Sequence, residues 1–93
     1  MRLRWSQRAN ADLERLWLFV AAFSPDRADM IEATLHRRIE LLLTFPKIGR
    51  IVRAPDVRAI SLPDIQYVVT YRIVDEEVWI IGIRHTREQG ERP

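Results

Sequence analysis

The chain has 93 residues, 47% of them apolar, and a formal charge of +2 at neutral pH, which fits one domain over residues 1–93 with a single modest core. It has no cysteine, which excludes disulfides and thiolate metal sites and is consistent with a reducing cytoplasm. The longest apolar run, residues 16–23, is far shorter than the ~18 residues of a membrane span, and the first residues lack the apolar run of a signal peptide. We therefore expect a cytoplasmic protein with no membrane partner.

The first half of the chain predicts a strand followed by two helices. Leu3 and Trp5 alternate with arginines over residues 2–5, as in a short strand with one apolar face. Ser6 is a suitable N-cap for a helix over residues 7–22, where apolar side chains recur at three- and four-residue steps.

The second predicted helix begins at Pro25, is capped by Ser24 and ends before Pro46. Its apolar stripe runs from Ala28 to Leu42 in steps of 3, 4, 4 and 3 residues. Because the connection between the two helices is so short, they are expected to form an antiparallel hairpin.

The second half alternates with a period of two residues and predicts three strands, over residues 57–61, 66–74 and 77–84. Gly82 falls inside the last of these, where a glycine indicates a bulge or the close approach of another group. The polar residues 88–93 are expected to fray. The element order is therefore β-α-α-β-β-β, an α+β fold in which a helical hairpin packs on one face of a mostly antiparallel sheet.

Basic residues are nearly all of one kind and are concentrated in one region. All but one of the fifteen are arginines, whose planar guanidinium groups suit phosphates, carboxylates and bases, although a GC-rich genome would enrich arginine in the same way. Residues 46–63 carry a single acid, Asp56, against four cations: Lys47, Arg50, Arg53 and Arg58. We therefore expect these cations to form a local surface for an anionic target.

The sequence offers few ways to perform chemistry. It lacks a glycine-rich phosphate loop, a His–Cys metal site and a nucleophile-elbow serine, so neither a cofactor nor a metal is predicted. Metal-free RNA cleavage needs only an acid, a base and cations for the phosphate. Histidine suits proton transfer near neutral pH, which makes His85 the candidate acid or base, with Arg58, Arg84 and Arg87 holding the phosphate. The same surface could instead grip a protein or DNA without cleaving it.

Each candidate also has a purely structural alternative. His85, at a strand end, could be a hydrogen-bonded edge residue. Tyr67 and Tyr71 could stack on a base, but they share a strand face with apolar neighbours and are better explained as core aromatics. Arg50 could cap the C-terminus of the second helix. Arg58, which opens a strand beside the cationic loop, is the candidate least easily explained in structural terms.

Five features follow one another along the chain. They are residues 5–9 followed by Asp12 and Leu13, Pro-x-x-Gly-Arg at residues 46–50, Arg58, Tyr-x-Val-x-Tyr at residues 67–71, and an Ile-rich strand at residues 80–85 followed by Arg87. In this combination the chain resembles the RelE/ParE superfamily of toxins from type II toxin–antitoxin modules. The resemblance covers nearly the whole chain.

The resemblance implies a toxin that a cognate antitoxin neutralises with its C-terminal segment, along the helical hairpin and the sheet. An exposed apolar stripe of Leu16, Phe19 and Phe23 would suit that partner. The residues expected to bind the toxin's target are six cations: Lys47, Arg50, Arg53, Arg58, Arg84 and Arg87.

Two branches of the superfamily differ in target. ParE-like members inhibit DNA gyrase without catalysis, whereas RelE-like members cut mRNA in the ribosomal A site, and in that case the catalytic residues would be Arg58, His85 and Arg87. The Pro-x-x-Gly-Arg element and the His-x-Arg ending favour the ParE branch, so gyrase is the expected target and a ribosome with mRNA the alternative. A third alternative is a module that has lost toxicity and survives as an antitoxin-binding partner or co-repressor.

Overall fold

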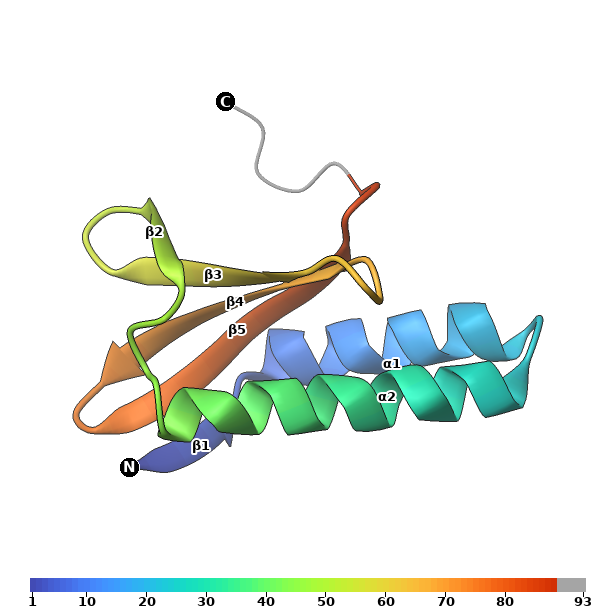
Figure 1. Cartoon of the computed structure of the whole chain (residues 1–93), viewed down its shortest axis with the longest axis horizontal. Coiled ribbons are helices and arrows are strands. Elements are labelled where there is room, and N and C mark those ends of the chain that lie inside the picture. Colours follow the sequence, from blue (N-terminus) through green and yellow to red (C-terminus); the bar gives the residue numbers. More distant parts are fainter. Residues whose placement is uncertain (89–93) are drawn as a thin grey trace.

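The computed structural model describes residues 1–88 and places two helices on one face of a five-stranded sheet (Figure 1). The elements in chain order are β1 (Arg2–Trp5), α1 (Gln7–Ala21), α2 (Pro25–Glu40), the 3-10 helix η1 (Leu41–Leu43), β2 (Arg50–Arg53), β3 (Val57–Leu62), β4 (Tyr67–Val74) and β5 (Glu77–His85). The strand order is β1-β5-β4-β3-β2, with β1 parallel to β5 and all other pairs antiparallel. The predicted α+β fold with a helical hairpin is confirmed, while the predicted fraying of residues 89–93 lies outside the described residues.

Both helices begin where the sequence predicts. The Ser6 hydroxyl accepts a hydrogen bond from the backbone N–H of Ala9 at 3.0 Å, and the Ser24 hydroxyl accepts one from Arg27 at 3.2 Å. α2 ends at Glu40 and continues as η1. In the part of the chain that is described, no helix is long and apolar enough to cross a membrane.

The core lies between the helices and one face of the sheet. Tyr67, Val69 and Tyr71 alternate on β4 and are at most 3% exposed, so the expectation that both tyrosines face the core is confirmed. From α2, Leu35 and Ile39 pack into the same cluster. Both tyrosine rings are therefore buried in the core, away from any base that binds at the surface.

β2 is the one strand that the sequence pattern misses. All four of its residues are exposed, so no alternation of apolar and polar side chains marks it. It is a strand because it pairs with β3, with Arg50 opposite Ala59 and Arg53 opposite Val57. Only the tertiary structure supplies that partner.

Gly82 lies next to an irregularity in β5, as predicted. Thr70 pairs with Gly82 and Tyr71 with Ile80, so Ile81 is an extra residue in the β5 side of the ladder. A Cβ atom on Gly82 would lie 3.0 Å from the Thr70 hydroxyl and 3.6 Å from a carboxylate oxygen of Asp12. Glycine at this position therefore lets α1 and β4 approach β5 closely.

A candidate target-binding cleft on the open face of the sheet

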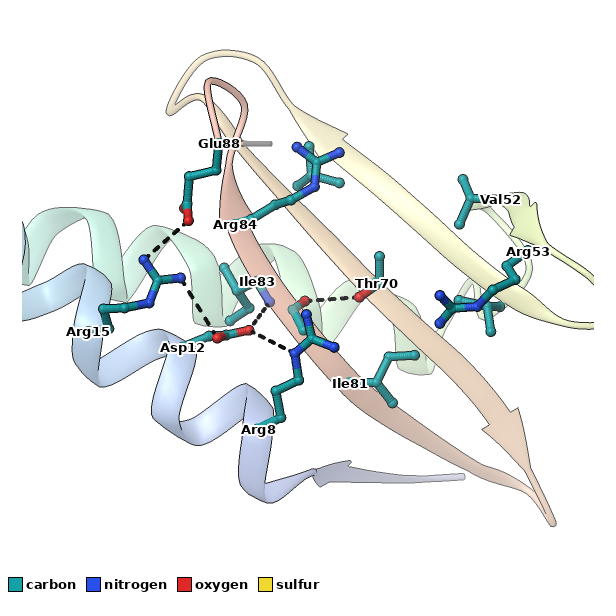
Figure 2. A pocket seen from close by; sticks show the side chains of 13 residues that line it. Arg8, Asp12, Arg15, Val52, Arg53, Thr70, Ile81, Ile83, Arg84 and Glu88 are labelled. Carbon is teal, nitrogen blue, oxygen red and sulfur yellow. Dashed lines mark hydrogen bonds and ion pairs between the residues drawn. The ribbon is translucent and has the colours of Figure 1, made fainter. Parts of the chain in front are cut away.

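The face of the sheet opposite the core contains a cleft of about 280 Å³ (Figure 2). Alternation along β4 sends Tyr67, Val69 and Tyr71 into the core and Val68 and Thr70 to the cleft floor. The lining residues come from α1, from all four strands β2 to β5 and from the segment after β5: Arg8, Asp12, Arg15, Val52, Arg53, Val57, Val68, Thr70, Ile81, Gly82, Ile83, Arg84 and Glu88.

The charged lining is mostly positive, since four arginines face two carboxylates. On α1, Asp12 lies 4.0 Å from the guanidinium of Arg8 and 3.7 Å from that of Arg15, and Arg15 in turn pairs with Glu88 at 3.2 Å (Figure 2). The side chain of Arg8 is 78% exposed, so its pairing with Asp12 contributes little to stability. The Arg8 guanidinium can therefore turn toward an anionic ligand at low cost.

The structure brings two of the predicted target-binding residues, Arg53 and Arg84, to this cleft. Figure 2 shows Arg53 pointing in from β2 and Arg84 rising from β5. Sequence reasoning missed Arg8 and Arg15, which join them from α1. The available signal was their spacing, because residues seven apart lie on the same face of a helix.

The other predicted cations lie elsewhere. Arg58 lies opposite Tyr71 in the β3–β4 ladder, on the core side of the sheet, where its Nη1 donates to the backbone oxygens of Gly49 at 2.7 Å and Lys47 at 3.3 Å. Lys47 is exposed in the loop before β2. Arg50 lines a separate groove between η1 and β3. The alternative that Arg50 caps the second helix is wrong, because α2 ends at Glu40 and Arg50 begins β2.

The residues proposed for catalysis are not assembled into one site. The imidazole ring of His85 lies edge-on against Tyr67, 5.2 Å between centroids, and its Nδ1 accepts the backbone N–H of Arg87 at 3.1 Å. His85 pairs with Tyr67 and Arg58 with Tyr71. These positions are about 13 Å apart along β4, at ~3.3 Å per residue. The Arg58 guanidinium is held by the loop at residues 47–49 while the His85 ring lies against Tyr67, so the two side chains do not share a site in this geometry.

The two tyrosines do not offer an alternative base. Burial raises the pKa of Tyr67, with a smaller contribution from the negative charge of Glu88. Burial also raises the pKa of Tyr71, although a hydrogen bond from the backbone of Gly49 acts in the opposite direction. A tyrosine that acts as a base at neutral pH needs its pKa lowered, so these shifts run against that role.

The predicted antitoxin-binding stripe is only partly exposed. Leu16 is 6% exposed and belongs to the core, so its inclusion in an exposed stripe was wrong. It faces α2 and the sheet, whereas Phe19 and Phe23 are 68% and 80% exposed and contact each other edge to face, 5.8 Å between centroids. Phe23 lies in the connection between α1 and α2, which projects beyond the sheet (Figure 1).

Solved structures share this architecture. The chain superposes on the chromosomal ParDE system from P. aeruginosa with a TM-score of 0.81 at 23% identity, covering 94% of this chain and 97% of that one. It superposes on the isolated E. coli RelE toxin with a TM-score of 0.70 at 21% identity, covering 95% and 86%. Both solved structures therefore share the fold of this chain, two helices packed on a mostly antiparallel sheet in this order.

Sequence comparison identifies the family. The model of the ParE toxin of the type II toxin–antitoxin system parDE matches residues 3–90. The putative toxin Y4kP of Sinorhizobium fredii is 31% identical over 88 residues, covering 95% of this chain and 91% of that protein. Toxin RelE2 of Caulobacter vibrioides is 32% identical over 81 residues, covering 87% and 90%. The chain therefore belongs to the ParE family of type II toxins.

Proposed function

We propose that this toxin inhibits DNA gyrase by binding to it, without catalysing a reaction. The composition of the cleft carries the proposal. Among the described residues that line it there is no histidine, tyrosine or lysine, and both carboxylates, Asp12 and Glu88, are already ion-paired. Such a lining can hold an anionic surface but offers no free acid or base. The match to the ParE family model supports the same branch.

We further propose that a cognate antitoxin neutralises the toxin at the end of the helical hairpin. The E. coli RelBE toxin has been solved as a complex with its antitoxin, and its fold matches this chain with a TM-score of 0.69. Phe19 and Phe23 form an exposed apolar pair that an apolar segment of a partner could cover. Both proposed interactions place the protein in the cytoplasm, where gyrase and a newly made antitoxin are found.

The second candidate is a ribosome-dependent mRNA endonuclease. Two relatives at 32% and 34% identity carry the name RelE, and the cleft's guanidinium groups would suit RNA phosphates. In this case catalysis would have to come from groups outside the cleft or from a rearrangement on the ribosome, because Arg58 and His85 lie apart.

One pair of assays separates the candidates. Purified toxin is added to a gyrase supercoiling reaction and, separately, to a translation extract whose mRNA is mapped by primer extension. Inhibited supercoiling with intact mRNA is the expected result. Codon-positioned cuts that disappear in His85→Ala would reject gyrase as the target and establish the endonuclease. Inactivity in both assays, with antitoxin binding retained, would indicate the third alternative, a module without toxicity.

A further inference from the structure

The loop at residues 46–49, which joins η1 to β2, is held by two side chains that reach it from the sheet. The Tyr71 hydroxyl donates to the backbone oxygen of Pro46 and accepts from the backbone N–H of Gly49, both at 2.8 Å. The Arg58 guanidinium donates to the backbone oxygen of Gly49 at 2.7 Å and more weakly to that of Lys47 at 3.3 Å. We call Tyr71 and Arg58 together the polar clamp.

The polar clamp leaves no room for a side chain at position 49. A Cβ atom on Gly49 would lie 2.7 Å from the Tyr71 hydroxyl and 2.8 Å from the backbone oxygen of Ala59. Pro46 and Gly49 of the Pro-x-x-Gly-Arg element therefore contribute backbone groups to the clamp. The element has a structural explanation that does not require its first four residues to touch a target.

Burial contributes little to the position of β2. Its four residues are all exposed, including Ile51 at 53% and Val52 at 42%, so burial of apolar surface contributes little to its position. Its ladder with β3 is short and shifts register between Ile51 and Arg53. A four-residue edge strand of this kind is weakly stabilised by itself. The hydrogen bonds of the polar clamp add a constraint at the point where the chain enters β2.

β2 forms one wall of the cleft, to which it contributes Val52 and Arg53 (Figure 2). We infer that Arg58 and Tyr71 are positioning residues, which act on the toxin's target through Arg53 by fixing the loop from which β2 starts. This inference rests on the proposed function, because it assumes that the target binds in the cleft. It changes the expected role of Arg58, whose charge faces away from the cleft.

A charge-neutral substitution tests the inference first. Tyr71→Phe keeps the buried ring and removes only the hydroxyl, so the domain stays folded while the loop loses two hydrogen bonds. We expect hydrogen exchange at the amides of residues 50–53 to become about tenfold faster, with exchange in α1 and α2 unchanged. Tyr67→Phe is the matched control, since Tyr67 shares the same strand face but does not contact the loop. Unchanged exchange in residues 50–53 would overturn the inference whatever the target is.

A double-mutant cycle then tests the action through Arg53. The toxin concentration that half-inhibits supercoiling is measured for Tyr71→Phe and for Arg58→Ala, each alone and in an Arg53→Ala background. Each is expected to weaken inhibition about tenfold alone and to have almost no further effect once Arg53 is absent. A full additional loss for Arg58→Ala in that background would mean that Arg58 contacts the target directly, which overturns the inference.

The two proposals fail in distinguishable ways. If the wild-type toxin does not inhibit gyrase, the proposed function is wrong. The same set of variants is then compared in cells that produce the toxin, and the inducer level that arrests growth is measured for each. Non-additivity in that assay supports the polar clamp, and additivity overturns it. Arg37→Ala serves as the charge control in both formats, because Arg37 is exposed on α2, outside the cleft, and its guanidinium donates to Thr34 on the same helix.

Discussion

A carboxylate oxygen of Asp12 in α1 accepts the backbone N–H of Ile83 in β5 at 2.9 Å. β1 pairs with β5 only as far as Ile80, and beyond that point α1 lies along the strand (Figure 2). Asp12 thus satisfies an edge group that would otherwise lack a strand partner. The same side chain lies between Arg8 and Arg15, so one residue joins the sheet edge to the charged wall of the cleft.

Asp12→Ala is expected to lower the free energy of unfolding by about 1–3 kcal/mol, because it leaves the N–H of Ile83 without its acceptor. Asp12→Asn should cost less, since the amide oxygen can still accept that hydrogen bond. Urea unfolding followed by tryptophan fluorescence measures both. Glu14→Ala, an exposed acid on the same helix, is the control and should leave the midpoint unchanged. Equal effects of Asp12→Ala and Glu14→Ala would contradict this role.

Gly49→Ala is expected to destabilise the domain by about 1–3 kcal/mol, because the new methyl group would overlap the Tyr71 hydroxyl and the backbone of Ala59. Gly82→Ala is the comparison: its nearest neighbour is the Thr70 hydroxyl at 3.0 Å, which a side-chain rotation can move away. Thermal unfolding of the two variants should therefore show the larger loss for Gly49→Ala. The reverse order would mean that the contacts around Gly49 relax more easily than the geometry indicates.

Leu16→Ala and Phe19→Ala are expected to separate folding from antitoxin binding. Leu16 is buried, so its truncation should reduce stability by about 2–4 kcal/mol. Phe19 is 68% exposed, so its truncation should leave the unfolding midpoint almost unchanged and weaken antitoxin binding, measured by calorimetry. Antitoxin affinity that is insensitive to both Phe19→Ala and Phe23→Ala would place the antitoxin on another surface.

Arg84→Ala is expected to weaken target inhibition roughly fivefold to tenfold, because it removes a positive charge from the cleft. The fold should tolerate the change, since the side chain is partly exposed and lies outside the core. The half-inhibitory toxin concentration and the thermal midpoint are measured on the same preparation. Inhibition equal to that of the wild type would show that the cleft is not part of the target-binding surface.

Stability should fall at alkaline pH because of the buried tyrosines. Burial raises the pKa of Tyr71 and of Tyr67 above the ordinary value of 10.0, so the folded state favours the neutral phenols. The contribution of the neutral phenols to the free energy of unfolding is fully present below the unfolded-state pKa of about 10 and is lost as pH rises through the higher folded-state pKa. Urea midpoints from pH 8 upward test it: the decline above about pH 10 should be shallower in Tyr71→Phe than in the wild type. Parallel declines would show that Tyr71 does not contribute.

Local patterns in the sequence were sufficient for most of the fold. Ser6 and Ser24 mark both helix starts, since a side-chain cap needs only residues three positions away. The alternation at residues 66–74 identified a strand and the inward direction of Tyr67 and Tyr71, because side chains on a strand alternate regardless of the partner. The arginines at positions 53 and 84 were recognised as candidates for the target surface from their type and position alone.

Only the tertiary structure determined which of these groups meet. β2 has no apolar face and exists through its pairing with β3, so no local pattern could predict it. Arg58 and His85 looked like one catalytic set in the sequence, yet the register of β3, β4 and β5 holds them apart along the sheet. Arg8 and Arg15 joined the cleft because α1 lies along the β5 edge. Sequence periodicity fixes which side a residue faces, whereas strand order and register, set by packing between distant segments, fix its neighbours.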